Sequence, residues 1–181
     1  GGMLLEPGMG VGIFLGLMPD ALRGNSRFTG VERERIAGGI AKNLYPNQNI
    51  QQADFTEWAG QKGFFDLAIG NPPFAATTLN DKAGDKHLSG LSVHNYFFAK
   101  TASRLREGGV VVFITTHFTM DAANAKQRSI ISNQGLKFLG AVRLNADAFG
   151  NVANTKVTTD IVVMQKVNLE SLVNTDNNGF N

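Results

Sequence analysis

Hydrophobic and polar positions alternate along this chain with two different periods, one typical of strands and one typical of helices. Strands are predicted by short apolar runs at residues 3–6, 27–32, 49–54, 64–70, 109–116, 137–144 and 156–167. The run at 109–116, "GVVVFITT", is almost continuously apolar, a pattern typical of a strand that is buried on both faces. Between most of these runs the spacing of apolar residues changes to that of a helix.

Helices are predicted at residues 13–18, 33–44, 92–105 and 120–135. In the second of these, Ile36, Ile40 and Leu44 recur four residues apart, and Pro46 follows as a stop. Glycines end the last two helices, the pair at 108–109 after the first of them and Gly135 after the other. The polar stretch at 75–90 is interpreted as a loop.

The alternation of strands and helices predicts an α/β fold with a doubly wound, mostly parallel sheet of seven strands. No helix separates the runs at 137–144 and 156–167, so these two strands are expected to be antiparallel. In open sheets of this class, ligands bind at the carboxyl ends of the parallel strands. The residues that end the first four strands are therefore the candidate site.

Composition places limits on this picture. The 181 residues suggest one domain, at 1–167, followed by a polar tail at 168–181. No apolar run is long enough for a membrane span, and a net charge of +2 permits an anionic partner without requiring one. The absence of cysteine excludes disulfides, thiolate zinc sites and cysteine nucleophiles, and fits a cytoplasmic location. His94 and His117 have no metal-ligand spacing, so no metal is predicted.

Each of the first four predicted strands ends on a polar side chain: Glu6, Glu32, Asp54 and Asn71. Strands are commonly followed by polar turns, so any one of these residues taken alone is explained as the start of a turn. Four successive cases, three of them carboxylates, favour convergence on one crevice. We therefore expect these residues, with Gly8, to line a single pocket.

The turn after the first strand, "EPGMGVG", begins with Glu6 and Pro7 and contains Gly8, Gly10 and Gly12. Glycines let the backbone approach a ligand closely and adopt positive φ. The spacing is G-x-G-x-G and not that of a dinucleotide-binding turn, and a carboxylate before it disfavours a pyrophosphate. Glu6 suits a ligand with a cationic end.

The next two strand ends add features of a nucleoside site. Glu32 is placed to accept hydrogen bonds from ribose hydroxyls. Asp54 has an acceptor for an adenine amino group, and Phe55 has a ring that can cover the base. A cationic nucleoside with ribose and adenine describes S-adenosylmethionine, which is the cofactor we infer.

The segments "LLEPGMGVG", "GVE", "ADF", "NPPF", "HNYFFAKTASRLREGG" and "AFGNVANTKVTTDIVVMQK" resemble successive motifs of the amino-group (N6-adenine) DNA methyltransferases. The resemblance covers residues 3 to 167. It implies a class I, Rossmann-like methyltransferase fold and transfer of a methyl group from S-adenosylmethionine to adenine N6 in DNA, as in restriction-modification. The amino-acid sequence around "HNYFFAK" and "TKVTTDI" also resembles that of methylase domains within long phage or mobile-element polypeptides.

The segment "NPPF" contains Asn71, Pro72, Pro73 and Phe74. The adenine amine is a poor nucleophile because its lone pair is delocalised into the ring. The Asn71 side-chain oxygen and the Pro72 carbonyl are two acceptors that would favour a more tetrahedral amine, while the prolines add no competing N–H. Phe74 can stack on the target base, and the resemblance implies Phe149 in "DAFGN" as the second ring; a core role for Phe149 is the alternative.

The resemblance also implies parts that are not visible in this sequence. Family members usually carry a segment that folds over the cofactor and a target-recognition domain, so we expect the chain to be a fragment of a larger parent polypeptide. Lys82, Lys86 and His87 lie in the polar loop, where phosphate contacts are one explanation, but we interpret these residues as solvated loop charges. Methyltransferases acting on RNA or on a protein glutamine share the motif, and a non-catalytic cofactor-binding module is a further alternative. The missing cysteine excludes cytosine-C5 methylation.

Overall fold

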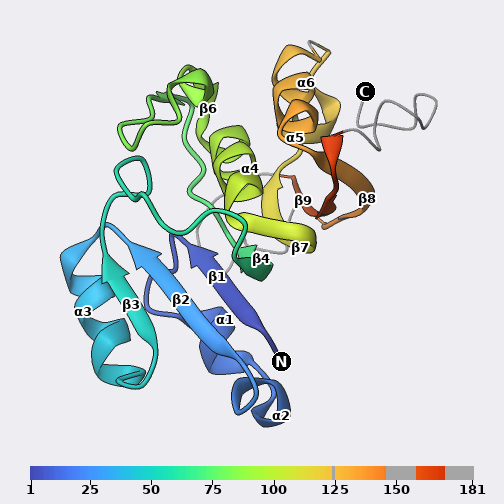
Figure 1. Cartoon of the computed structure of the whole chain (residues 1–181). Coiled ribbons are helices and arrows are strands. Elements are labelled where there is room, and N and C mark those ends of the chain that lie inside the picture. The colour runs from blue at the N-terminus through green and yellow to red at the C-terminus, as the bar shows by residue number, and fades with distance from the viewer. Residues whose placement is uncertain (124, 146–157, 170–181) are drawn as a thin grey trace.

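The computed structural model describes residues 1–123, 125–145 and 158–169, whose arrangement is shown in Figure 1. Its elements in chain order are β1 (Met3–Pro7), α1 (Ile13–Leu17), α2 (Asp20–Arg23), β2 (Arg27–Glu32), α3 (Arg35–Leu44), β3 (Asn49–Gln52), β4 (Phe65–Gly70), β5 (Thr78–Leu79), the short 3-10 helix η1 (Lys86–Leu88), β6 (Leu91–Ser92), α4 (Val93–Arg104), β7 (Leu105–Thr116), α5 (Phe118–Asp121), α6 (Lys126–Asn133), β8 (Leu136–Arg143) and β9 (Thr159–Lys166).

Seven of these strands form one sheet in the order β3-β2-β1-β4-β7-β9-β8. The pairs among β3, β2, β1, β4 and β7 are parallel, whereas β9 is antiparallel to both β7 and β8. The predicted doubly wound sheet with an antiparallel last strand is therefore confirmed. Strands β1, β2 and β4 end side by side, and the candidate residues follow these ends.

Both faces of the sheet are covered, and successive residues of β1 point to opposite sides. Leu4 packs with Leu15 of α1 and Ala41 of α3 in the smaller core cluster. Leu5 belongs to the larger cluster, which contains the buried face of α4. In Figure 1, α1 and α3 lie on one side of the blue and cyan strands, and α4 lies on the other. Helix α4 also packs against α6.

Helix α3 confirms the predicted element but faces the sheet with small residues. Its buried positions are Gly38 and Ala41, whereas Ile36, Ile40 and Leu44 are exposed. A Cβ on Gly38 would lie 3.7 Å from Cγ of Glu32, so the helix backbone runs close to the end of β2. The four-residue spacing correctly places the three apolar side chains on one face of the helix. That face is exposed, and the opposite face packs on the sheet.

The boundary between α4 and β7 differs from the prediction. The helix ends at Arg104 and the strand begins at once with Leu105, so the glycine pair at 108–109 lies inside β7. Gly108 has φ 76°, and the pairing of β7 with β4 shifts register beside it. These glycines form an irregularity in the strand and do not end the helix.

Two other predicted segments are subdivided. The stretch at 120–135 contains the end of α5 and the whole of α6, and Gly135 follows the second helix with φ 79° as predicted. The loop at 75–90 contains β5 and η1, and β5 pairs with β6 in a small antiparallel ribbon.

Within the residues that the structure describes, no helix has the length and apolar character to cross a membrane.

Candidate active site

A cavity of about 330 Å³ lies where β1, β2 and β4 end; we call it the strand-end cavity. Its lining includes six of the predicted residues: Gly8, Glu32, Asp54, Phe55, Asn71 and Pro73. Glu6, Pro7, Gly10 and Gly12 belong to the first turn but are not among the residues that line the cavity. The structure therefore brings six of the predicted residues to one cavity, whereas Glu6, which was expected to line the same pocket, does not line it.

The turn after β1 is held against β2. The backbone N–H groups of Gly8 and Met9 both donate to the carbonyl oxygen of Val31, at 2.8 and 3.2 Å. Gly8 has φ 69°, and a Cβ there would lie 3.4 Å from the ring of Phe97 and 3.7 Å from Cδ of Pro73. Position 8 thus requires glycine on conformational grounds, since L side chains rarely adopt such a φ.

Glu32 is fixed by backbone donors. One carboxylate oxygen accepts the N–H of Gly10 at 2.8 Å and the other accepts the N–H of Glu34 at 2.7 Å. Each oxygen keeps a lone pair that can accept from a hydroxyl in the cavity. Gly10 consequently acts by orienting Glu32. Gly12 lies further back, where its carbonyl accepts from the Tyr45 hydroxyl at 3.0 Å.

Glu6 is almost completely buried beneath this turn, and its Oε2 has no hydrogen-bond partner among the described residues. Burial, and secondarily the negative charge of Glu32, raises the pKa of Glu6 to about 8. A carboxyl group in this setting is largely protonated at neutral pH. A cation placed nearby would favour the ionised form.

Asp54 remains ionised at the far side of the cavity. Its partial burial acts to raise the pKa, but hydrogen bonds from the Thr56 N–H and hydroxyl, at 2.8 and 2.7 Å, lower it overall. The neighbouring Phe55 is buried, with its ring centroid 4.8 Å from that of Phe97 and 5.7 Å from that of Trp58. Phe55 therefore offers a rigid apolar wall, while Asp54 offers acceptors.

The segment after β4 separates this cavity from a second one. Asn71 and Pro73 line the strand-end cavity, Pro72 is buried, and the half-exposed ring of Phe74 lines the other cavity. Among the described residues, the Asn71 carboxamide has no hydrogen-bond partner. The motif thus places the Asn71 carboxamide, which is free to form hydrogen bonds, at the strand-end cavity and the aromatic ring of Phe74 at the second cavity.

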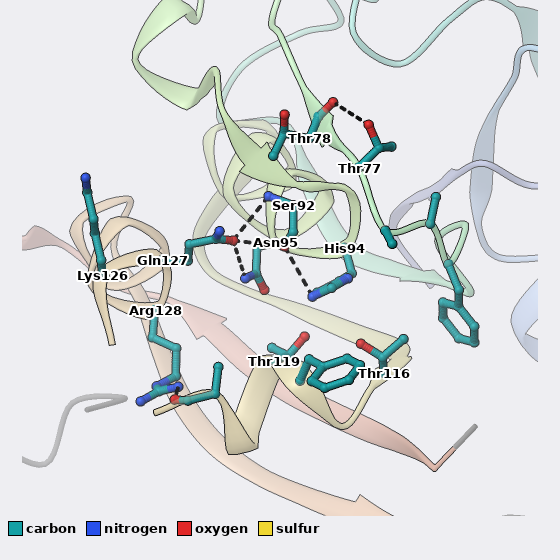
Figure 2. Close-up of a pocket in the computed structure, with 15 residues that line it drawn as sticks. Thr77, Thr78, Ser92, His94, Asn95, Thr116, Thr119, Lys126, Gln127 and Arg128 are labelled. Atoms are coloured by element: carbon teal, nitrogen blue, oxygen red, sulfur yellow. Dashed lines mark hydrogen bonds between the residues drawn. The ribbon is translucent and has the colours of Figure 1, made fainter. Parts of the chain in front are cut away.

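The second cavity has a volume of about 610 Å³ and is shown in Figure 2; we call it the α4–α6 cavity. Its walls come from the start of α4 and the ribbon β5–β6 on one side, and from the end of β7 with α5 and α6 on the other. Ala75 and Thr77 line both cavities, so the two are adjacent across the segment that follows Phe74. The sequence analysis did not predict this second cavity.

A group of buried ions behind the site also escaped the sequence analysis. Lys100 of α4 lies 2.8 Å from Asp81, and Arg104 lies 2.9 Å from Asp85. The two cations are four residues apart on one helix and the two carboxylates four residues apart in the preceding loop. That matched spacing of two cations and two carboxylates was the available signal in the sequence.

Several predictions about other residues have separate outcomes. Phe149 lies outside the described residues, so its proposed role stays a prediction. Lys82 of the loop is exposed and its ammonium is 2.8 Å from the Glu57 carboxylate. His87 is exposed and contacts Gln134. No cluster of three or more metal-binding side chains occurs in the described part of the chain.

Comparison with known proteins identifies the family. The sequence model of the Eco57I restriction-modification methylases matches residues 23–146, more than half of the chain. The chain belongs to the Eco57I restriction-modification methylase family. The predicted relationship to amino-group DNA methyltransferases is thereby confirmed at the level of the family.

A named relative of this Eco57I-family chain is the Type II methyltransferase M.TthHB8I of Thermus thermophilus, which is 31% identical over 162 residues. The alignment covers 78% of this chain but only 36% of the relative, so the chain spans about a third of that protein's length.

Solved structures show the same fold. A Listeria monocytogenes protein described as a class I S-adenosylmethionine-dependent methyltransferase superposes with a TM-score of 0.72 at 16% identity, over 93% of this chain and 55% of that one. Geranyl diphosphate C-methyltransferase from Streptomyces coelicolor, solved with S-adenosyl-L-homocysteine, gives 0.64 at 13% identity, over 92% of this chain and 70% of that one. The Eco57I-family chain thus has the class I methyltransferase fold.

Proposed function

We propose that this chain transfers a methyl group from S-adenosylmethionine to the exocyclic N6 amine of adenine in DNA. The observation that carries the proposal is the position of Asn71. Its carboxamide lines the strand-end cavity at the point where the segment continues into the wall of the α4–α6 cavity. A residue placed between two adjacent cavities suits a reaction in which a donor on one side meets an acceptor on the other.

The strand-end cavity has groups that fit S-adenosylmethionine. The carboxylate of Glu32, fixed by two backbone N–H groups, would accept from the ribose hydroxyls. Asp54 and Phe55 would meet the adenine edge and face. The unpartnered Oε2 of Glu6 lies beneath the glycine turn, where the cationic end of the cofactor would favour its ionised form. When bound, the cofactor supplies an electrophilic methyl group on a sulfonium.

The residues of this chain act on the acceptor amine. The Asn71 oxygen and the Pro72 carbonyl would each accept an N–H of the amine, which favours a tetrahedral nitrogen with an available lone pair. The nitrogen would then bond to the methyl carbon that the bound cofactor supplies, while the sulfur–methyl bond breaks and S-adenosylhomocysteine remains. The methylated nitrogen loses one proton to water. No covalent bond to the protein is required.

Because adenine inside a duplex cannot reach a recessed strand end, the target nucleotide must rotate out of the helix. Phe74 supports this step, since an exposed ring beside the acceptors can stack on an extruded base. We also propose that the chain works within a longer polypeptide, because it covers 36% of its relative. We expect other parts of that polypeptide to supply sequence recognition.

A side-by-side methylation assay tests the proposal. The protein in its natural length is incubated with labelled S-adenosylmethionine and with duplex DNA, RNA or a peptide-chain release factor. We expect label on DNA that is recovered as N6-methyladenine after digestion. Label on RNA or on a glutamine side chain would assign the site to those substrates. Cofactor binding without transfer to any of them would indicate a non-catalytic module.

A further inference from the structure

We infer that the α4–α6 cavity is the binding site of the target nucleotide, and that Phe118 and Gln127 contact that nucleotide. The inference rests on the proposed function, because it assigns the acceptor side of the same reaction. It adds two residues, from α5 and α6, that the sequence motifs did not identify. Neither residue belongs to the segment "NPPF" or to the region of Phe149.

The first argument comes from the aromatic rings. Among the described residues, the large hydrophobic side chains that are exposed include two aromatic ones, Phe74 at 38% and Phe118 at 58%, and both line this cavity. Two exposed rings therefore gather at one cavity, and nucleobases stack on such rings with little dependence on sequence. The ring of Phe118 is braced from behind by His117, with ring centroids 4.0 Å apart.

The second argument comes from Gln127. Its Oε1 accepts three hydrogen bonds, from the Ser92 N–H at 3.1 Å, the Ser92 hydroxyl at 2.8 Å and the Asn95 amide at 2.7 Å, as Figure 2 shows. A backbone N–H can only donate, so the atom facing Ser92 must be the oxygen of the carboxamide. The orientation of Gln127 is thereby fixed.

The Nε2 of Gln127 therefore points away from these donors and keeps two N–H groups that have no partner in the described part of the chain. A ligand with acceptors would satisfy them. Adenine presents ring nitrogens and a nucleotide presents phosphate oxygens. The three bonds to Oε1 also tie α6 to the first turn of α4, so the donors are held on a rigid wall.

The third argument comes from buried polar atoms in the same wall. His94, Asn95 and Thr116 line the cavity and are each at most 7% exposed. His94 Nδ1, Asn95 Oδ1 and Thr116 Oγ1 have no hydrogen-bond partner among the described residues. Buried polar atoms in native proteins are nearly always paired with protein groups, water or a ligand, so these three unpaired atoms leave the wall with polar groups that a water molecule or a polar ligand can satisfy after a small side-chain movement.

The size and position of the cavity agree with a nucleotide. Its volume of about 610 Å³ falls within the range of small-molecule sites. It adjoins the strand-end cavity through Ala75 and Thr77. A base stacked at Phe74 would therefore have its amine on the side of Asn71, where the methyl group arrives.

The inference is tested with a single-stranded oligonucleotide that carries 2-aminopurine in place of one adenine, because an unpaired base has no flipping cost. We compare the protein in its natural length with Phe118→Leu, which keeps apolar volume but removes the ring, and with Phe118→Tyr, which keeps the ring. Leu139→Ala is the matched control, since Leu139 is an exposed apolar residue on β8 that does not line the cavity. Thermal unfolding verifies that each variant folds.

We expect the wild-type protein to quench the 2-aminopurine fluorescence, since the probe would stack on a ring. Phe118→Leu should weaken binding roughly tenfold and reduce the quench, whereas Phe118→Tyr and Leu139→Ala should behave as wild type. Gln127→Glu replaces the free N–H donors by an oxygen and should also weaken binding, with less effect on the quench. Equal affinity and quench in wild type and Phe118→Leu, or no quench by the wild type, would overturn the inference.

The methylation assay separates this inference from the proposed function. If DNA is methylated and Phe118→Leu leaves the KM for DNA unchanged, only the assignment of the cavity fails. If no DNA is methylated but binding of the probe still depends on Phe118 and Gln127, the nucleotide site stands and the proposed reaction fails. When both are correct, Phe118→Leu raises the KM for DNA about tenfold and changes kcat less.

Discussion

The ammonium of Lys100 lies 2.8 Å from Oδ2 of Asp81, and both side chains are fully buried. The Tyr96 hydroxyl donates to the same oxygen at 2.5 Å, and the other carboxylate oxygen accepts the N–H of Asp85 at 2.7 Å. Lys100 and Tyr96 belong to α4, whereas Asp81 belongs to the loop that follows "NPPF". This ion pair therefore fixes the loop to the helix on which both cavities depend.

A second pair reinforces the attachment. Asp85 accepts from Arg104 at 2.9 Å and from Lys62 at 2.9 Å, so one loop carboxylate holds two cations from different segments. Buried pairs contribute little net stability compared with an apolar replacement, because removing two ions from water is costly. Their role here is positional: they determine where the segment after Phe74 runs.

Replacing Lys100 alone should be strongly destabilising. In Lys100→Met the carboxylate of Asp81 stays buried without its cation, and breaking such a pair costs about 3–5 kcal/mol of unfolding free energy. Urea denaturation measures this loss. Lys82→Met is the matched control, because Lys82 forms an exposed pair with Glu57 that should contribute less than about 1 kcal/mol. Equal losses in the two variants would contradict a structural role for the buried pair.

Asp81 should also make the fold sensitive to acid. Burial acts to raise its pKa, but hydrogen bonds from Lys100 and Tyr96 lower it to about 2. A lowered carboxyl pKa contributes stability above the ordinary value near 3.8, and that contribution is lost as the pH falls towards 2. The Tm of the wild type should therefore fall between pH 4 and 2 by more than that of Asp81→Asn. A Tm difference between them that does not change with pH would argue against this assignment.

The sequence predicted the sheet well because strand and helix periods reflect burial directly. It predicted the strand-end residues for a related reason: consecutive parallel strands end at one edge, so Glu32, Asp54 and Asn71 had to be neighbours. It could not predict which face of α3 packs on the sheet. That choice depends on how closely the helix backbone approaches, and Gly38 and Ala41 allow a closer approach than Ile36 does.

The α4–α6 cavity depends on contacts that leave no local pattern. Ser92 and Gln127 are 35 residues apart and meet only because α6 packs beside α4. Phe118 is one of 13 phenylalanines in the sequence, and nothing in its neighbours distinguishes an exposed ring from a core one. The Lys100 and Asp81 pair was similarly ambiguous, since charged residues in a loop or at helical spacing are usually solvated.

Glu6 should couple cofactor binding to proton release. Burial raises its pKa from the ordinary value of 4.5 to about 8, so the carboxyl group of the free protein is largely protonated at neutral pH. The stability of the fold decreases as the pH rises from 4.5 to about 8, because the carboxyl group ionises more easily in the unfolded chain. A cationic ligand stabilises the carboxylate, so binding expels the proton and affinity increases from pH 6 to pH 8. Calorimetry in two buffers of different ionisation enthalpy measures the protons released by S-adenosylmethionine.

A matched pair of variants isolates the carboxyl group. Glu6→Gln should bind the cofactor with no such release and with a flatter pH dependence, because it cannot ionise. Glu57→Gln, at an exposed carboxylate, should behave as wild type. Proton release that persists unchanged in Glu6→Gln would show that another group titrates on binding.

Asn71 and Glu32 should separate catalysis from cofactor binding. Asn71→Ala removes an acceptor that matters most as the amine becomes tetrahedral, and removing one such preorganised partner typically lowers kcat about 10²–10³-fold. Asn71→Asp should be milder because it keeps an acceptor oxygen. Glu32→Ala should weaken cofactor binding and be partly rescued by saturating cofactor, since its two oxygens are held by backbone N–H groups at the strand-end cavity. Steady-state methylation kinetics and cofactor titration together distinguish these effects. If Asn71→Ala lost cofactor affinity while its kcat stayed normal, the carboxamide would serve the cofactor and not the amine.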